Sequence, residues 1–222
     1  VGNAKLKIEF IGELNDRLRG FYRSRYHDGN GKERYLATTQ FEATDARRAF
    51  PCWDEPSLKA SFEVTLIVDS EFAVISNTME AEEFDEDDGL KRVKFKETPI
   101  MSTYLLAFIV GDLKSVEKVA DDGTLVRVWA TAGKEEQGHF AVETSVKLLS
   151  YFNDYFGTPY PLEKLDHLAI PDFAAGAMEN WGAVTYREVV LLVDPDQSSA
   201  QIRQRVAAII SHEMAHMWFG DL

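Results

Sequence analysis

Alternating apolar and polar residues run through the first 130 or so positions of the chain and constrain its fold more than any other feature. The pattern begins at residues 5–10 and recurs at residues 62–68, 92–96 and 125–129. A period of two is typical of β-strands with one buried face, because successive side chains of a strand point to opposite sides. We therefore expect a strand in each of these four segments.

Turn sequences separate the expected strands, with Asp-Gly-Asn-Gly at 28–31 and Asp-Gly at both 88–89 and 122–123. Such pairs favour the tight turns that join antiparallel strands. The only helical pattern in this part of the sequence is a short piece at 43–48. Residues 1–131 are therefore expected to form a mainly antiparallel β domain.

The pattern changes at residue 132, where a second domain covering 132–222 is expected to begin. Apolar residues then fall at helical spacing: Phe140, Leu148, Leu149, Phe152 and Phe156. Gly157 and Pro159 are residues that end helices. After this helix we expect a strand at 165–170, a turn rich in Gly and Ala, and a second strand at 183–193.

The sequence Ser-His-Glu-Met-Ala-His at 211–216 places two histidines four residues apart. On an α-helix such residues project from one face on successive turns, so His212 and His216 can bind one metal ion. Glu213 is turned about 100° away from His212. It is therefore expected to miss the metal and to reach its bound water as a general base. This pattern predicts a zinc site.

The helix that carries this motif is expected over 201–217, which contains neither Pro nor Gly. Its apolar side is formed by Ile202, Val206, Ile209 and Ile210. Ser198 or Asp196 is expected to cap its start, and Gly220 to stop it. The alternative is a buried amphipathic helix whose two histidines hydrogen-bond to each other or to the backbone.

A catalytic zinc site needs a third protein ligand and an open position for water. The metzincin class is excluded, because its third His would fall at Leu222 and Phe219 stands in place of its Gly. A glutamate on a later helix, beyond Leu222, would complete a site of two His and one Glu. Because the chain also starts at Val1 rather than Met, we expect it to be a fragment that is truncated at both ends.

The chain carries 24 Lys and Arg residues against 37 Asp and Glu, a net charge of −13. This charge argues against a nucleic acid partner and suits the cationic amines of peptides. The alternative, which we favour for most of these charges, is that they serve only solubility, as in the loop at 80–88. The single cysteine, Cys52, and the absence of an Asn-x-Ser/Thr acceptor favour a cytoplasmic location. The longest apolar runs, 104–110 and 189–193, are far shorter than the roughly 18 residues of a membrane helix.

Two further segments have a composition suited to binding a peptide. In Ala-Ala-Gly-Ala-Met-Glu-Asn-Trp-Gly at 174–182, small residues would let an extended substrate approach an exposed edge and pair with it as an added strand, with Glu179 beside it. The alternative is a tight turn with a solvated carboxylate. In Thr-Gln-Phe-Glu at 39–42, alternation would present Gln40 and Glu42 on one face of a strand.

The sequence GAMENWG stands about 30 residues before HEMAHMWFG, and this pair resembles the signature of the M1 family of gluzincin aminopeptidases. Residues 12–16, 20–24 and 39–56 resemble the same family, so that the likeness spans nearly the whole chain. The resemblance implies a mainly β, saddle-like N-terminal domain. It also implies that the first part of an α+β, thermolysin-like catalytic domain follows.

The resemblance further implies an enzyme that removes N-terminal residues from peptides with a free N-terminus. His212 and His216 would hold one Zn²⁺ with a Glu beyond Leu222, and Glu213 would be the base. The pocket for the substrate's amino group and backbone would include Gln40, Glu42, Gly176, Ala177, Met178, Glu179 and Asn180. Asp221 stands where Asn is commoner in the family, a difference that we expect to have no effect.

Three hypotheses follow for the function. The first is a zinc aminopeptidase, of which these 222 residues alone are expected to be inactive. The second is a thermolysin-type zinc endopeptidase, which shares the His-Glu-x-x-His motif and needs no acidic pocket on the amino side of the cleaved bond. The third is a noncatalytic truncated isoform that acts as a binding module.

Overall fold

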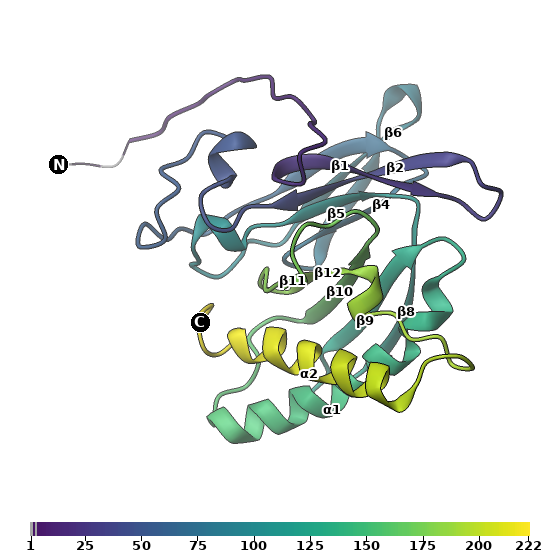
Figure 1. Ribbon diagram of the computed structural model, residues 1–222. Helices are drawn as coiled ribbons and strands as arrows, with labels where there is room; N and C mark the ends of the chain where they lie inside the picture. Colours follow the sequence, from purple (N-terminus) through teal and green to yellow (C-terminus); the bar gives the residue numbers. More distant parts are fainter. Residues whose placement is uncertain (1, 3) are drawn as a thin grey trace.

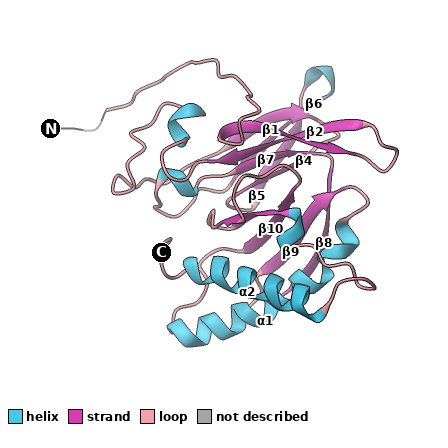
Figure 2. Cartoon of the chain, viewed as in Figure 1, coloured by secondary structure: helices cyan, strands magenta, loops and turns pink. Residues whose placement is uncertain are grey.

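The computed structural model describes residue 2 and residues 4–222 as two β-sheets followed by a third sheet with two helices (Figures 1 and 2). The first seven strands are β1 (Gly20–His27), β2 (Glu33–Gln40), β3 (Thr65–Asp69), β4 (Ala73–Ser76), β5 (Glu80–Asp85), β6 (Leu90–Phe95) and β7 (Phe108–Gly111). They are followed by β8 (Leu113–Val119), β9 (Leu125–Thr131), α1 (His139–Phe156), β10 (Lys164–Ile170), β11 (Ala177–Met178), β12 (Ala183–Arg187) and α2 (Ala200–His216).

Two antiparallel sheets make up the first half of the chain, in the strand orders β1-β2-β7-β4 and β3-β6-β5. In β1 every second residue is buried, beginning with Gly20 and Tyr22, so one face of this strand lies on the core. The turns predicted at 28–31 and 88–89 join β1 to β2 and β5 to β6. The prediction of a mainly β N-terminal region is confirmed.

The third sheet is mixed, in the order β11-β12-β10-β9-β8. Its central strand β10 runs parallel to both β9 and β12 and is buried along its whole length, as is usual for a strand covered on both faces. Strands β8 and β9, at 113–131, therefore pair with the later part of the chain, although the sequence analysis grouped them with the first domain. The domain division at 131/132 stays a prediction.

The two helices lie side by side below the third sheet (Figure 1). Helix α1 packs on β8 and β9, and α2 packs on α1. Helix α1 ends at Phe156. The next residue, Gly157, caps it with a φ of 64°, the left-handed conformation that Gly adopts without strain. One hydrophobic cluster continues from the first sheet through the third sheet to α2, so the helix with the two histidines is anchored to the rest of the chain.

Three predicted strands differ from those observed. Residues 5–10 form no strand, and Leu6 is 75% exposed, because no described segment hydrogen-bonds to this stretch. The strand expected at 62–68 is limited to β3, and the strand expected at 183–193 ends at Arg187, where a 3-10 turn (Glu188–Val190) begins. Alternation alone does not make a strand, because its backbone groups also need a partner.

Helix α2 is capped by Ser199 rather than by Ser198 or Asp196 as predicted. The Ser199 side chain accepts a hydrogen bond of 3.3 Å from the backbone N–H of Ile202. We expect Ser199→Ala to lower the free energy of unfolding by about 1 kcal/mol, because one N–H of the first turn loses its acceptor. Urea denaturation measures this change. The matched control Ser198→Ala is expected to unfold like the wild type, and an equal loss in both variants would contradict the assignment of the cap.

A buried charged network joins the sheets. Arg127 forms two hydrogen bonds with the carboxylate of Asp166, of 2.6 and 2.8 Å, and Lys164 Nζ lies 2.7 Å from Asp166 Oδ2. Lys164 and Asp166 are fully buried. Charges in such a position are stable only when they are paired and hydrogen-bonded, and both conditions are met here. The ammonium group also donates to the backbone carbonyls of Ser76 and Gly182.

Candidate active site

His212 and His216 lie on one face of α2, near its C-terminal end. Their Nε2 atoms are 3.2 Å apart and the two rings are nearly perpendicular, at 85°. Two nitrogens that bind one tetrahedral zinc at about 2.0–2.1 Å are themselves about 3.3 Å apart. This distance matches the separation of two nitrogen ligands of one metal ion, and it is also that of a hydrogen bond between the two rings, the alternative stated for this helix. Within the described residues, no group of three or more His, Cys, Asp or Glu side chains gathers to hold a metal.

Glu213 points away from the solvent, with 7% of its surface exposed. Burial raises the pKa of its carboxyl group to about 8, and the negative charges of Glu179 and Glu42 contribute to the rise. A cation bound by the neighbouring histidines would act in the opposite direction. The carboxyl group of Glu213 thus lies in a poorly solvated place among other acids, as is usual for a group that transfers protons.

Residues 176–182 form the outer edge of the third sheet. Strand β11 pairs only with β12, with Ala177 opposite Tyr186 and Met178 opposite Thr185. The other side of β11 is an edge, as a substrate-binding strand requires. Because the Met178 side chain is fully buried, this residue offers a substrate only its backbone, whereas Gly176 is exposed.

Asn180 turns its side chain inward. Its Nδ2 atom donates to Thr185 Oγ1 at 3.1 Å and to the carbonyl of Ala183 at 3.4 Å, and the residue is 1% exposed. These bonds hold the segment against the following strand. Between the buried Met178 and Asn180, the half-buried Glu179 is the residue of this stretch that brings charge to the site.

The local structure of Gln40 and Glu42 differs from that predicted. Strand β2 ends at Gln40, so the two residues do not alternate on one strand. Gln40 is 7% exposed and its Oε1 atom has no hydrogen-bond partner among the described residues. Burial raises the pKa of Glu42, the charge of Glu179 raises it further, and His216 lowers it. Glu42, two residues after the end of β2, therefore lies within electrostatic range of Glu179, which follows β11, and of His216.

Asp221 is a residue of the site that the sequence analysis dismissed. It is fully buried, and neither oxygen of its carboxyl group has a partner among the described residues. Burial raises its pKa to about 9, Glu179 adds to the rise, and Lys59 opposes it. Tyr104 lies in the same cluster, because burial and then the charge of Asp221 raise its pKa to about 12. No sequence pattern reports such burial.

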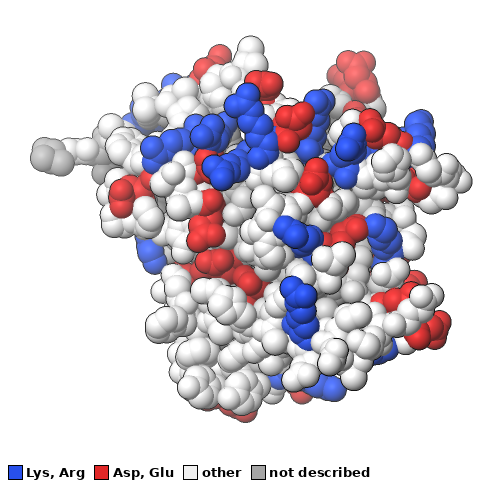
Figure 3. Space-filling model, viewed as in Figure 1, with Lys and Arg blue, Asp and Glu red and all other residues white. Residues whose placement is uncertain are grey.

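Acidic side chains are visible on the face between the upper sheets and the helices, and basic ones gather above them (Figure 3).

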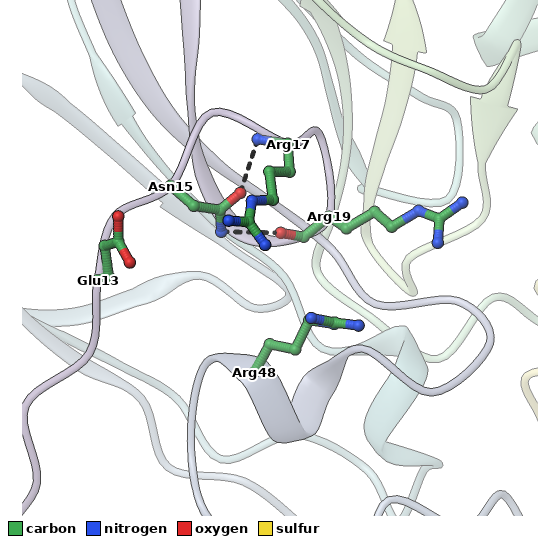
Figure 4. A pocket seen from close by; sticks show the side chains of 5 residues that line it. All are labelled: Glu13, Asn15, Arg17, Arg19 and Arg48. Carbon is green, nitrogen blue, oxygen red and sulfur yellow. Dashed lines mark hydrogen bonds between the residues drawn. The ribbon is translucent and has the colours of Figure 1, made fainter.

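A separate hollow of about 500 Å³ is lined by Glu13, Asn15, Arg17, Arg19 and Arg48. In this hollow Asn15 fixes the turn through bonds to the backbone of Arg17 and Arg19 (Figure 4). None of its lining residues belongs to α2 or to residues 176–182, so it is distinct from the histidine site.

Comparison with known proteins agrees with this arrangement. Residues 1–105 match the family model described as Peptidase M1 N-terminal domain, and residues 140–222 match that described as Peptidase family M1 domain. The chain belongs to peptidase family M1. The resemblance noted from the sequence is thereby confirmed, as is the order of a mainly β region followed by the start of the M1 catalytic domain.

Several M1 relatives are named aminopeptidases. The chain is 56% identical to Aminopeptidase M1-A of Oryza sativa subsp. japonica over 100% of its own length and 25% of that protein. It is 50% identical to Puromycin-sensitive aminopeptidase of Caenorhabditis elegans over 98% of its length and 23% of that protein. It is 53% identical to Aminopeptidase 2, mitochondrial, of Saccharomyces cerevisiae, again over 23% of that protein. The chain thus spans about a quarter of the length of these M1 proteins.

Proposed function

We propose that the whole M1 protein containing this chain is a zinc aminopeptidase. The observation that carries the proposal is the meeting of the histidine pair on α2 with carboxylates from two other elements. Glu179 follows β11, Glu42 follows β2, and both change the pKa of Glu213 on the helix. These segments are far apart in the sequence, so folding of the chain brings them together. The assignments of the individual residues remain part of the proposal.

His212 and His216 would hold the zinc ion, with a glutamate beyond Leu222 as third ligand, as the family resemblance implies. Their Nε2 atoms already converge, at 3.2 Å. When bound, zinc supplies a Lewis acid that polarises the substrate carbonyl and makes water more acidic. The chain's own contribution is to fix two imidazoles on a rigid helix, which is packed against α1.

Glu213 would move the proton. Its carboxylate takes a proton from the attacking water and later delivers it to the nitrogen of the leaving amine. The burial of Glu213 supports this role, because a poorly solvated carboxylate has a raised proton affinity and is a stronger base than one in water.

Glu179 and Glu42 would bind the α-ammonium group of the substrate, with the amide oxygen of Gln40, which has no partner among the described residues, as a further acceptor. An ammonium ion between two carboxylates in a partly desolvated place is bound strongly, whereas a blocked amide is not. If the amino end is held here, only the first peptide bond reaches the histidine pair. The free edge of β11 would bind the backbone of the same peptide.

Hydrolysis by the whole protein separates the three hypotheses. An aminoacyl reporter with a free amine tests the aminopeptidase, and an internally quenched peptide with a blocked amino end tests the thermolysin-type endopeptidase. We expect cleavage of the first and little cleavage of the second. Preference for the blocked peptide would support the endopeptidase, and binding of peptides without cleavage of either would support the noncatalytic isoform.

The 222 residues alone are expected to bind zinc weakly and to show no aminopeptidase activity. Within the described residues, no third His, Cys, Asp or Glu joins the histidine pair to hold a metal, and the ligands of a zinc site support one another's geometry. Isothermal titration with zinc measures the affinity, and His216→Ala is the control for binding elsewhere on the acidic surface. Tight binding of one zinc per chain together with peptide cleavage would contradict this expectation.

Peptides with a free N-terminus are the proposed partners, and the charge of −13 still argues against nucleic acid. No described helix combines the length and the apolar character needed to cross a bilayer. A cytoplasmic location stays a prediction, and one relative is named as mitochondrial.

A further inference from the structure

Two successive carbonyl groups at the end of the 176–182 segment are held by buried side chains from other parts of the chain. Asn77 Nδ2 donates to the carbonyl of Trp181 at 2.9 Å, and Lys164 Nζ donates to the carbonyl of Gly182 at 2.7 Å. Asn77 follows directly after β4, and Lys164 begins β10. Neither residue is a proposed ligand of zinc or of the substrate.

Asn77 connects residues 176–182 to the backbone at 105–107, directly after Tyr104. Its Nδ2 atom also donates to the carbonyl of Leu105 at 2.8 Å, and its Oδ1 atom accepts from the N–H of Ala107 at 2.9 Å. The residue is 1% exposed, so these bonds do not compete with water. The Asn77 side chain thereby holds the backbone at 105–107, which follows Tyr104, next to the backbone at Trp181, which follows Glu179.

Lys164 connects the same segment to the buried charged network. Its ammonium group donates to the carbonyl of Ser76, next to Asn77 in the chain, and is neutralised by Asp166 at 2.7 Å. Because Asp166 is also bound by Arg127, the carboxylate keeps a charged partner if Lys164 is replaced. Burial lowers the pKa of Lys164, and the charge of Asp166 opposes this effect.

Gly182 lets the two anchors approach the backbone closely. A Cβ atom built on this residue would lie 2.2 Å from the backbone oxygen of Asn77, and the φ of 79° is in the left-handed region. Any other residue would push the segment away from Asn77. The end of the segment is therefore fixed from three sides, within three residues of Glu179.

We propose that Asn77 and Lys164 are positioning residues that determine where Glu179 lies and thereby how well the site binds a free amino group. The inference rests on the proposed aminopeptidase function and adds two residues to it. Glu179 itself is half-buried and makes no hydrogen bond to another described residue that would fix its place. Its position therefore depends on the backbone on either side, which pairs with β12 before it and with Asn77 and Lys164 after it.

The expected consequence is a change in substrate binding rather than in the chemical step. The ammonium group is held equally in the ground state and the transition state, and loss of such uniform binding raises KM without lowering kcat. We expect Asn77→Ala in the whole protein to raise KM for a free-amine reporter about 10-fold, with kcat nearly unchanged. Its preference for free over N-acetylated peptides is expected to fall by the same factor.

The matched control is Ser76→Ala. Ser76 is the neighbour of Asn77 and is as buried, its hydroxyl donates to the carbonyl of Ala107, and its backbone carbonyl, which accepts from Lys164, is kept in the variant. Lys164→Met is the second variant, because it removes the bond to Gly182 and leaves Asp166 paired with Arg127. Hydrogen–deuterium exchange of the amides at 176–182 is measured in parallel, and faster exchange is expected in Asn77→Ala and Lys164→Met but not in Ser76→Ala.

A raised KM with faster exchange in either variant, and with neither change in the control, supports the proposal. An unchanged KM, an equal change in Ser76→Ala, or failure of both variants to fold while the control folds would overturn it, because Asn77 and Lys164 would then serve stability alone. Wild type that cleaves free and acetylated peptides equally would instead overturn the proposed function, whatever the variants do.

Discussion

Replacing Glu213 by Gln in the whole protein is expected to lower kcat by about 10²- to 10⁴-fold, the usual contribution of a general base. Gln has nearly the same shape, and it cannot take a proton from water. Glu213 is 7% exposed on a packed helix, so a change to Ala would also leave a cavity, which Gln avoids. Zinc content is expected to stay at the wild-type level, because the histidine pair is untouched.

Steady-state kinetics and elemental analysis of the same preparation test this prediction. The control is Glu143→Gln on α1, whose carboxylate pairs with Lys118 on the surface. We expect this variant to turn over substrate like the wild type. Turnover of Glu213→Gln at the wild-type rate would exclude Glu213 as the base, and loss of zinc from it would assign this residue to metal binding instead.

Replacing Glu179 by Ala is expected to cost about 2 to 4 kcal/mol in transition-state binding of free-amine substrates, the scale for removing one member of a desolvated charge pair. The effect arises because Glu42 then faces the substrate's ammonium group alone. Burial raises the pKa of Glu42 most, and the charge of Glu179 adds to the rise. Removal of Glu179 should therefore also lower the pKa of Glu42, while the part of the rise that is due to burial stays.

The ratio of kcat/KM for free and N-acetylated peptides measures this loss. Glu163→Ala is the control, because this glutamate is exposed and pairs with Lys96 outside the cluster. An unchanged ratio in Glu179→Ala would remove the amine pocket from the proposal. The thermolysin-type endopeptidase would then be the better description of the site.

The helices were the part of the fold that the sequence predicted best. Apolar spacing predicted that helix α1 ends at Phe156, before Gly157, and its last residue is Phe156. Helix α2 was expected over 201–217 and spans Ala200–His216. A helix satisfies its own backbone hydrogen bonds, so its local pattern contains most of the information about its bounds.

Strands were predicted less well, because their partners are distant in sequence. Residues 92–95 of the predicted segment 92–96 lie in β6 and residues 125–129 lie in β9, whereas residues 5–10 alternate as clearly and pair with no described segment. The pattern of a strand reports which faces are apolar. It does not report whether a neighbouring backbone is available, and this decides whether the strand forms.

The residues of the candidate site differ in how far the sequence alone could predict them. The histidine pair follows from helix geometry alone, because residues four apart share a face. Glu42 and Gln40 were connected to the site through the family resemblance. Asp221, Asn77 and Lys164 have no sequence pattern that marks them, because what distinguishes them is their burial and their distant contacts. Lys164, for example, binds Ser76, which is more than 80 residues away in the sequence. Such contacts are created by the fold and have no local signature.

If the whole protein is the proposed aminopeptidase, the brevity of β11 has a consequence for the fate of a peptide after the first cleavage. The strand comprises only Ala177–Met178, and each backbone hydrogen bond that a ligand adds there contributes about 1 kcal/mol. A longer edge would retain the shortened product and would also invite unrelated unfolded chains to add as strands. With so little backbone to hold, the trimmed peptide can dissociate, shift by one residue and present its new amino end for another round.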